Sequence, residues 1–284
     1  MALATRHGKE RVIGRALRHG LRAHLCHLVD VDTDQLGSFC GSVPRSLAPL
    51  QACRAKAELA LAHSGLSLAI ASEGSFGPHP AMPFLPAGRE CMVFLDAERG
   101  LVISEELLAR RTNFAHRWLT PADAQAARWP EDVWAWLAAI GFPSHAVLVR
   151  PGGGLPNPLP AVSKGIRALP ELGHAIRVAA STGDGRVLLE TDMRAHCNPT
   201  RMASIRQLSF RLVRRLGRLC PACGAPGWGL VGQLPGLPCD WCDTPTDGTL
   251  WELFGCVRCA EQQRLPRADG LKVADPAQCP RCNP

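Results

Sequence analysis

The chain has 284 residues, of which 46% are hydrophobic and 20% are charged, and this suffices for one large folded domain and one small one. It contains no run of 18 apolar residues, which excludes a transmembrane helix, and residues 1–15 carry charges where a signal peptide needs an apolar run. We therefore expect a cytoplasmic protein without a membrane partner.

The positive charge is concentrated in the first three quarters of the sequence. The whole chain has 32 Lys and Arg residues and 25 Asp and Glu residues; five and seven of these follow residue 218, which leaves 27 and 18 in residues 1–218. Such a basic surplus favours anionic partners such as nucleotides, other phosphorylated molecules or nucleic acids, without choosing among them.

Residues 1–218 alternate between predicted strands and predicted helices. Short apolar runs predict strands at 3–5, 22–31, 66–71, 91–95, 101–104, 146–150 and 186–190. Helical periodicity predicts a helix that ends at Leu17 and further helices over 48–63, 121–129, 130–140 and 170–180. This alternation indicates an α/β domain with a mixed sheet and flanking helices.

The last helix of this domain is the best marked in the sequence. Asn198 is a natural N-cap, Pro199 suits the first helical position, and Gly217 ends the helix. One apolar stripe comprises Ile205, Leu208, Leu212, Leu216 and Leu219. Several arginines on the other positions have no acidic residue among them, which is typical either of a solvated face or of a surface that meets anions.

Eight of the thirteen cysteines lie in the last 65 residues as four Cys-x-x-Cys pairs. The pairs are Cys220/Cys223, Cys239/Cys242, Cys256/Cys259 and Cys279/Cys282. Two thiolates three residues apart can hold one ion from a tight turn, so four pairs supply two Cys₄ zinc sites. We predict that residues 219–284 form a small double zinc-ribbon or knuckle module, stabilised by two structural zinc ions.

Other uses of paired cysteines fit the pattern less well. Disulfides are rare inside cells, iron–sulfur proteins usually cluster three cysteines with a remote fourth, and no βαβ pattern surrounds the pairs as in a thioredoxin-like motif. The pairing stays open: adjacent pairs can join, the two middle pairs can join in a nested arrangement, or alternate pairs can join in a cross-braced one. Residues 249–254 favour the nested arrangement, because they look like the strand before a ribbon's second knuckle.

Three polar segments follow predicted strands, at residues 5–10, 32–39 and 72–79. Ligands of open α/β sheets bind where strands end, so we expect the three segments to converge at one edge of the sheet. Thr5, His7 and Lys9 are candidates for binding phosphate at a strand-to-helix turn. Taken singly, each segment is also typical of ordinary turn and capping residues.

Carboxylates in these segments are candidates for a magnesium site. Asp32, Asp34 and Glu73 offer the oxygen ligands that magnesium prefers near phosphates, and Asp34 and Glu73 would then take part in catalysis. His79 lies between two prolines, where it is a candidate general base or a rigid turn residue.

A fourth segment, residues 190–201, is the densest in polar side chains. It contains Asp192, Arg194, His196, Asn198 and Arg201. Arginine forks bind anions, imidazole exchanges protons, and a helix N-terminus favours negative charge, so we expect a concave pocket that holds an anion, with His196 as acid or base. Lys164, after the Gly/Pro-rich run 151–160, is a further ligand-binding candidate. The alternative is a structural network in which the aspartate pairs with an arginine.

Several segments carry a family resemblance: ATRHGKE, DTDQLGSF, ASEGSFGPHP, TDMRAHCNPTRM and the terminal cysteine pairs. With these motifs the chain resembles a bacterial family of domains of unknown function, DUF6671, over nearly its whole length. The resemblance implies a two-part protein with a zinc-binding tail and brings no activity with it.

The first hundred residues are also similar to the inosine triphosphate pyrophosphatase superfamily, which hydrolyses non-canonical nucleotides. The matching positions are Thr5 and Lys9 of a phosphate loop, Gly37-Ser38-Phe39 of a second loop, Lys56-Ala57 of a helix, and Glu73 as a metal-binding acid. The sequence has His7 where that family usually has Asn, and it lacks the customary Asp beside Glu73. This resemblance implies nucleotide hydrolysis with magnesium.

Together these features favour a zinc-containing α/β protein that binds a nucleotide or hydrolyses a phosphoanhydride with the help of magnesium. One rival is a nucleic-acid-binding protein that uses the Arg-rich helix and the zinc ribbons as its platform. Another is a scaffold in which zinc stabilises a tail that docks a partner.

Overall fold

The computed structural model describes residues 1–5, 7–36, 47–109, 111–153, 162–182 and 184–284. The chain forms two compact units, one of residues 1–100 and 104–211 and one of residues 101–103 and 212–284. The mixed sheets and flanking helices, followed by cysteine clusters, confirm the predicted fold class. None of the helices among the described residues is both long enough and apolar enough to cross a membrane.

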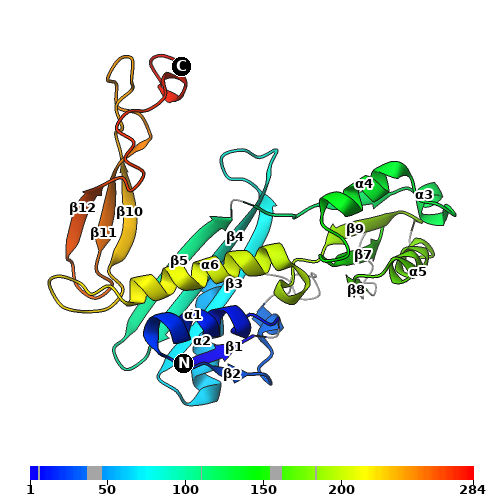
Figure 1. Cartoon of the computed structure of the whole chain (residues 1–284), viewed down its shortest axis with the longest axis horizontal. Coiled ribbons are helices and arrows are strands. Elements are labelled where there is room, and N and C mark those ends of the chain that lie inside the picture. The colour runs from blue at the N-terminus through cyan, green and yellow to red at the C-terminus, as the bar shows by residue number, and fades with distance from the viewer. Residues whose placement is uncertain (6, 37–46, 110, 154–161, 183) are drawn as a thin grey trace. The chain divides into compact units, whose positions relative to one another are not determined.

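A five-stranded sheet has the order β2-β1-β3-β4-β5 (Figure 1), and all of it except residues 101–103 of β5 belongs to the first unit. The strands are β1 (Ala2–Ala4), β2 (Cys26–Leu28), β3 (Leu68–Pro78), β4 (Pro86–Asp96) and β5 (Leu101–Ala109). Strand β1 is parallel to β2 and β3, whereas β3 and β4 form a long antiparallel hairpin. Because Ala2 pairs with Ala69, the short β1 ends beside the middle of β3, and β3 continues past it.

Strand β3 is longer than the sequence predicted. We expected a strand over 66–71 and then a polar loop, but residues 72–78 stay in the strand and pair with residues 86–92 of β4. Hydrogen bonds to β4 override the weak strand propensity of the Gly and Ser residues in this stretch. The opposite error occurs at 22–31, where only Cys26–Leu28 forms a strand.

Helices cover the five-stranded sheet. They are α1 (Glu10–Leu21), α2 (Pro49–Ser64) and α6 (Pro199–Leu216). Alternate strand residues such as Ala69, Ala71 and Val93 pack in one core with Ala57 of α2. Helix α6 runs across the strands (Figure 1). Its Arg211 pairs with Glu105 of β5. The predicted apolar stripe of α6 is buried at Ile205, Leu208, Leu212 and Leu216.

A second, four-stranded antiparallel sheet in the same unit has the order β6-β9-β7-β8. Its strands are β6 (His116–Leu119), β7 (Val147–Pro151), β8 (Ser163–Ile166) and β9 (Val187–Thr191). The accompanying helices are α3 (Pro121–Gln125), α4 (Glu131–Ala139) and α5 (Leu169–Ala180). Their shared core includes Leu137, Val147, Ile176 and Leu189. The sequence predicted β7, β9 and the helices but not β6 and β8, which carry too few apolar residues to stand out.

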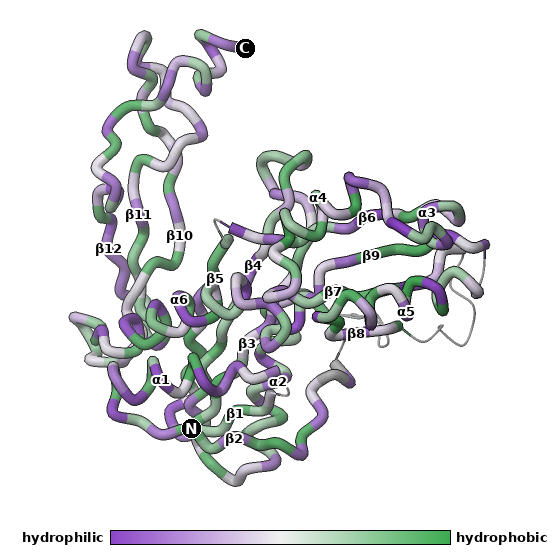
Figure 2. Tube along the Cα trace, turned by 45° about the vertical axis from the view of Figure 1, so that its right-hand side comes forward, coloured by the Kyte–Doolittle hydropathy of each residue, from purple (hydrophilic) through white to green (hydrophobic). Residues whose placement is uncertain are grey.

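The second unit is built on a three-stranded antiparallel sheet. Its strands are β10 (Gly229–Pro235), β11 (Thr249–Gly255) and β12 (Gln262–Pro266), in that order. The edge strand β12 is mostly hydrophilic, as Figure 2 shows. Among residues 219–284 the buried hydrophobic residues are Cys220, Ala225, Leu237, Cys239, Ala274 and Cys279. Only one of them is a large aliphatic residue, so this segment has almost no apolar core.

Candidate metal centres and a buried charge cluster

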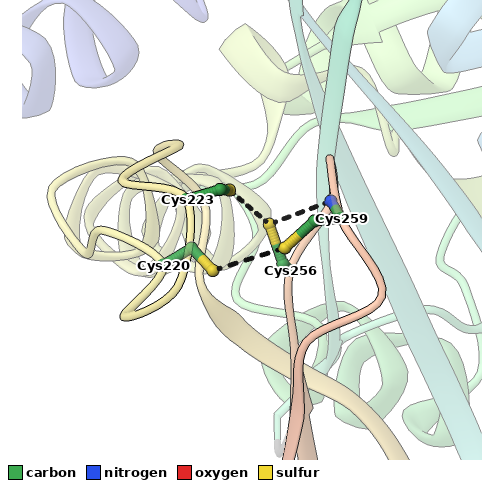
Figure 3. Close-up of side chains that lie close together, drawn as sticks. All are labelled: Cys220, Cys223, Cys256 and Cys259. Atoms are coloured by element: carbon green, nitrogen blue, oxygen red, sulfur yellow. Dashed lines mark hydrogen bonds between the residues drawn. The ribbon is translucent and has the colours of Figure 1, made fainter.

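The eight paired cysteines form two tetrads, and in each the four sulfur atoms lie within 4.8 Å of one another. Site I comprises Cys220, Cys223, Cys256 and Cys259 (Figure 3), and site II comprises Cys239, Cys242, Cys279 and Cys282. Pairs of sulfurs are 3.7 Å and 3.6 Å apart in site I and 3.9 Å and 3.7 Å apart in site II. A tetrahedron with metal–sulfur bonds of about 2.3 Å has edges of about 3.8 Å, so both tetrads can bind a metal ion.

The tetrads join alternate pairs, which is the cross-braced arrangement. Strands β10 and β11 are antiparallel with Gly229 opposite Gly255, so the pair before β10 and the pair after β11 meet at the same end of the sheet. The pair at 239–242 follows β10 and lies at the other end, where the last pair completes site II. The strand predicted at 249–254 is confirmed, but it leads to the partner of the first pair and not of the second.

Backbone amides help to hold the thiolates of site I. The amide groups of Arg258 and Cys259 lie 3.2 Å and 3.4 Å from the sulfur of Cys256. Burial acts to raise the pKa of Cys256, but these donors outweigh it and lower the pKa to about 6. The turn is therefore arranged for a charged sulfur, the form that ligates a metal.

Five buried charged side chains gather on β3 and β4 and on the elements beside them. Lys56 of α2 pairs with Glu73 of β3 at 2.5 Å, and Arg201 of α6 pairs with Glu90 of β4 at 2.7 Å. Lys9, before α1, is the fifth member and is as deeply buried as the others. Three cations thus face two carboxylates, a formal excess of one positive charge in a region shielded from water.

Lys9 has no carboxylate partner of its own among the described residues. It is 5% exposed, and its amine donates one hydrogen bond, over 2.9 Å, to the backbone oxygen of Ser72. Burial, together with the charge of Arg201, lowers the pKa of Lys9 to about 8. The hydroxyl oxygen of Ser72 is also buried and has no hydrogen-bond partner in the part of the chain that the structure describes. Two polar groups beside the end of β1 therefore have unused bonding capacity.

The side chain of Arg201 is fixed by contacts with three other residues. Its guanidinium bonds Glu90 and the backbone oxygen of Met193, and it lies 5.2 Å above the ring of Phe76. Gly74 provides the space, because a Cβ at this position would lie 2.6 Å from Arg201 and 2.7 Å from Glu90. Arg201 therefore binds α6 to the hairpin β3–β4.

The segment between β9 and α6 forms a second polar network. Asp192 is fully buried, and it accepts hydrogen bonds from the guanidinium of Arg194 at 2.6 Å and from the amide of Gly165 at 3.1 Å. Burial acts to raise the pKa of Asp192, but the bonds from Arg194 lower it overall. Asp192 therefore pairs with Arg194, as in the structural network that was the alternative to an anion-binding pocket for residues 190–201.

Residues 56–284 match the model of a family described as a domain of unknown function, DUF6671. The chain belongs to the DUF6671 family. Neither the curated proteins nor the solved structures contain a match. The resemblance of the N-terminal part to inosine triphosphate pyrophosphatases gains no support from these comparisons, and the match leaves out the Thr5–Lys9 turn on which that resemblance partly rests.

In the DUF6671 protein, several predicted ligand-binding residues lie around one turn. Thr5 and Lys9 are buried where β1 leads into α1, and the ring of His7 stacks on that of His196 with centroids 5.3 Å apart. The Cβ of His196 would be 3.5 Å from a Cβ at Gly8. Burial and the charge of Arg194 lower the pKa of His196, which keeps this imidazole neutral at pH 7. The β1–α1 turn and the start of the β9–α6 segment are therefore neighbours.

Two other predicted residues, His79 and Lys164, lie in the loop after β3 and on β8, respectively. His79 lies in the loop between β3 and β4, where its Nδ1 accepts hydrogen bonds from the amides of Ala81 and Met82, as a rigid turn residue does. Six residues of extended strand, about 20 Å, separate it from Glu73. Lys164 is exposed on β8.

Among the described residues, the predicted magnesium ligands form no group with metal-binding geometry. Asp32 is exposed, and Glu73 is paired with Lys56. Asp34 lies in a short 3₁₀ turn, Thr33–Leu36, and its side chain is outside the described residues, as are Gly37-Ser38-Phe39 and positions 154–161 of the Gly/Pro-rich run. The described residues with metal-binding geometry are those of the two cysteine tetrads.

The start of α6 follows the sequence prediction closely. Asn198 caps the helix, because its side-chain oxygen accepts a hydrogen bond of 2.9 Å from the amide of Arg201. The side-chain nitrogen of Asn198 donates a hydrogen bond of 2.8 Å to Oδ1 of Asn113, and this bond fixes the orientation of the capping side chain. Asn198 is therefore a structural cap, and Pro199 is the first helical residue as expected.

Two members of the buried charge cluster were missed by sequence reasoning as site residues. Glu90 directly follows Arg89 in β4, and Lys56 lies between Arg54 and Glu58 in α2, so charged neighbours hide the burial of both residues. The sequence cannot name the partner, which for Glu90 lies 111 positions away.

Proposed function

We propose that both cysteine tetrads hold Zn²⁺ and that the ions are structural. Four thiolates at tetrahedral spacing are a donor set that Zn²⁺ accepts, and with all four corners occupied by protein no position remains for a substrate. The segment 219–284 buries a single large aliphatic side chain, so metal binding is the available source of its folding free energy.

We further propose that the first unit binds a phosphorylated small molecule at the turn between β1 and α1. The observation that carries this proposal is the buried amine of Lys9, which has one hydrogen-bond acceptor and no carboxylate partner among the described residues. A charged amine in this position is costly unless an anion compensates it. A phosphate would supply both the charge and the acceptors that the spare N–H groups lack.

The surroundings of Lys9 suit a phosphate in two further respects. Helix α1 begins here without a side-chain cap, so its first backbone amides are free of the usual side-chain acceptor and its dipole favours negative charge. The turn also follows the carboxyl end of the parallel strand β1, where ligands of such sheets bind. The stacked imidazoles of His7 and His196 lie beside the turn and can offer ring N–H donors.

The proposal is for binding and includes no magnesium ion. Glu73, one of the predicted magnesium ligands, is neutralised by Lys56, and Arg194 and Arg201 are engaged by Asp192 and Glu90. The recognition of the anion therefore rests on Lys9 and the helix terminus, with His196 at the rim.

The test is calorimetric titration of the full chain with ATP, AMP and inorganic phosphate. Lys9→Met should weaken the binding of the preferred ligand at least tenfold, since it removes a buried charge that has no carboxylate partner among the described residues. Lys272→Met, which removes an exposed lysine of the other unit, should leave the affinity unchanged. Equal affinity of wild type and Lys9→Met, with both folded by circular dichroism, would remove Lys9 from the site; no binding of any of the three ligands would refute the proposal.

A second candidate function is nucleic-acid binding by α6. Arg206 and Arg214 are exposed, and neither side chain has a hydrogen bond or ion pair with a described residue. Affinity for duplex DNA or RNA that falls steeply with salt, and that drops in an Arg206→Ala/Arg214→Ala variant, would support this function.

A further inference from the structure

Site II carries a tryptophan that its own fold does not use. Trp241 lies between the ligands Cys239 and Cys242 and is 77% exposed. Its backbone amide lies 3.5 Å from the sulfur of Cys239, so the metal-binding turn fixes its position while the indole points into solvent. A large aromatic side chain held rigidly in water is typical of a binding residue.

Acidic residues surround this tryptophan. Asp240 and Asp243 flank it in the same turn and are exposed. Asp275 is also exposed and lies close by, because the amide of Asp240 bonds the backbone oxygen of Ala274 at 3.1 Å. Within the two cysteine turns of site II the only cation is Arg281.

The bound metal makes this end of the molecule more negative still. Four thiolates and one Zn²⁺ have a formal charge of about −2 per site. Residues 219–284 contain five Lys and Arg and seven Asp and Glu residues, so with both ions bound the segment has a formal charge of about −6. Residues 1–218, with 27 basic and 18 acidic residues, have the opposite sign.

We propose that the exposed surface formed by Asp240, Trp241, Asp243 and Asp275 docks an arginine- or lysine-rich segment of a partner protein. An indole face is negative and attracts a guanidinium or ammonium group within about 6 Å, and the aspartates add to this attraction. Electrostatic complementarity of this kind also speeds association and selects the partner.

The same charges argue against nucleic acid at this site. Exposed aromatic residues can stack on bases, but such sites combine stacking with a positively charged groove along the backbone. Here phosphates would meet three aspartates and a negatively charged metal site. A basic peptide is therefore the occupant that the surface fits.

The inference rests in part on the proposed metal occupancy, and its test separates the two. The metal content of the full chain is measured first by elemental analysis, so a protein without metal contradicts the proposed function independently of docking. Fluorescein-labelled nona-arginine is then titrated at low salt, with fluorescence anisotropy as the readout. We expect saturable binding to the metal-loaded chain.

Matched variants test the site. Trp241→Ala should weaken peptide binding about two- to fivefold, the range expected for one exposed cation–π contact. Asp240→Asn should also weaken it, whereas Trp251→Ala and Glu261→Gln, elsewhere in the same unit, should not. All variants must retain the wild-type metal content.

Three results would overturn the inference. The first is no saturable binding of the peptide to the metal-loaded chain. The second is an equal loss of affinity in the site II variants and the controls, which would mean that the peptide responds only to net charge. The third is tighter binding of an oligothymidylate than of the peptide, with the difference abolished by Trp241→Ala, which would assign the surface to nucleic acid.

Discussion

The two units of this chain are stabilised by different means. The first unit packs apolar side chains in the cores of two sheets and buries charged groups mainly in pairs between elements. The second unit gathers eight cysteines in two tetrads, and after position 218 it buries only one large aliphatic residue. Contacts between distant parts of the chain are thus apolar and ionic in the first unit. In the second unit they gather at the two cysteine tetrads, where we propose metal ions, so the two units should fail under different treatments.

Metal removal should have the largest effect and should be confined to the second unit. Structural zinc contributes about 10–16 kcal/mol in zinc-finger peptides, far more than the stability of a small domain. Treatment with a strong chelator should therefore abolish amide protection in β10, β11 and β12 and leave it intact in β3 and β4. Hydrogen exchange followed by mass spectrometry measures both units in one experiment.

A cysteine series sharpens the same prediction. The wild type should contain about two zinc ions per chain, and Cys256→Ser should lose the ion of site I. Cys53→Ala serves as the control, because Cys53 belongs to the core of the first unit and should not change the zinc content. Persistent protection of β10–β12 without metal would show that this segment folds on other interactions.

Replacement of one partner of the buried ion pair Arg201–Glu90 should cause the next largest loss of stability, and this loss should occur in the first unit. Arg201→Met leaves the carboxylate of Glu90 buried and unpaired, which costs about 3–5 kcal/mol. The double variant Arg201→Met/Glu90→Met should recover most of that loss, because two apolar side chains can replace a buried pair. Urea unfolding of the three proteins measures the difference, and a double variant no better than the single one would contradict this account.

How far the sequence predicts each unit depends on how local the determinants are. Each Cys-x-x-Cys pair is complete within four residues, so the sequence points to all eight members of the two tetrads, whereas their cross-braced pairing depends on the register of β10 and β11. Asn198 and Lys9 were likewise marked by local strand–turn–helix patterns. No local pattern marks Glu90 as part of a buried pair, because its partner Arg201 is remote in the sequence. The length of β3 could not be predicted either, because it depends on pairing with β4.

A glycine comparison tests how tightly the Arg201–Glu90 pair is packed. Gly74→Ala should destabilise the first unit by about 1–3 kcal/mol, since the new methyl group would overlap both side chains and force them apart. Gly77→Ala in the same strand is the control, because no atom lies within 4 Å of its Cβ position. Thermal melting of the two variants should differ clearly; equal melting temperatures would mean that the pair can move aside at little cost.

The smallest expected effect is a pH dependence that originates at Lys9. Its pKa of about 8 is lowered by burial and by Arg201 of α6 and Lys56 of α2, and is raised in part by Glu73 of β3 and Glu90 of β4. Below about pH 8 the amine is charged and can bind a phosphate. Above that pH an anion must bring a proton with it, so the affinity should fall by up to tenfold per pH unit, about 1.4 kcal/mol.

AMP is a suitable probe, because its phosphate is fully ionised above pH 8 and does not titrate itself. The affinity of the wild type should decline between pH 8 and 10, while Lys9→Arg, which stays charged throughout, should show a flat profile. The stability of the ligand-free protein should change in the opposite sense. Because the folded pKa lies below the ordinary value of 10.5, the cost of burying the charged amine is fully present below pH 8 and is relieved as the pH rises toward 10.5. The wild type should therefore gain stability relative to Lys9→Met over this range, and parallel pH profiles for the two proteins would show that Lys9 is not the titrating group.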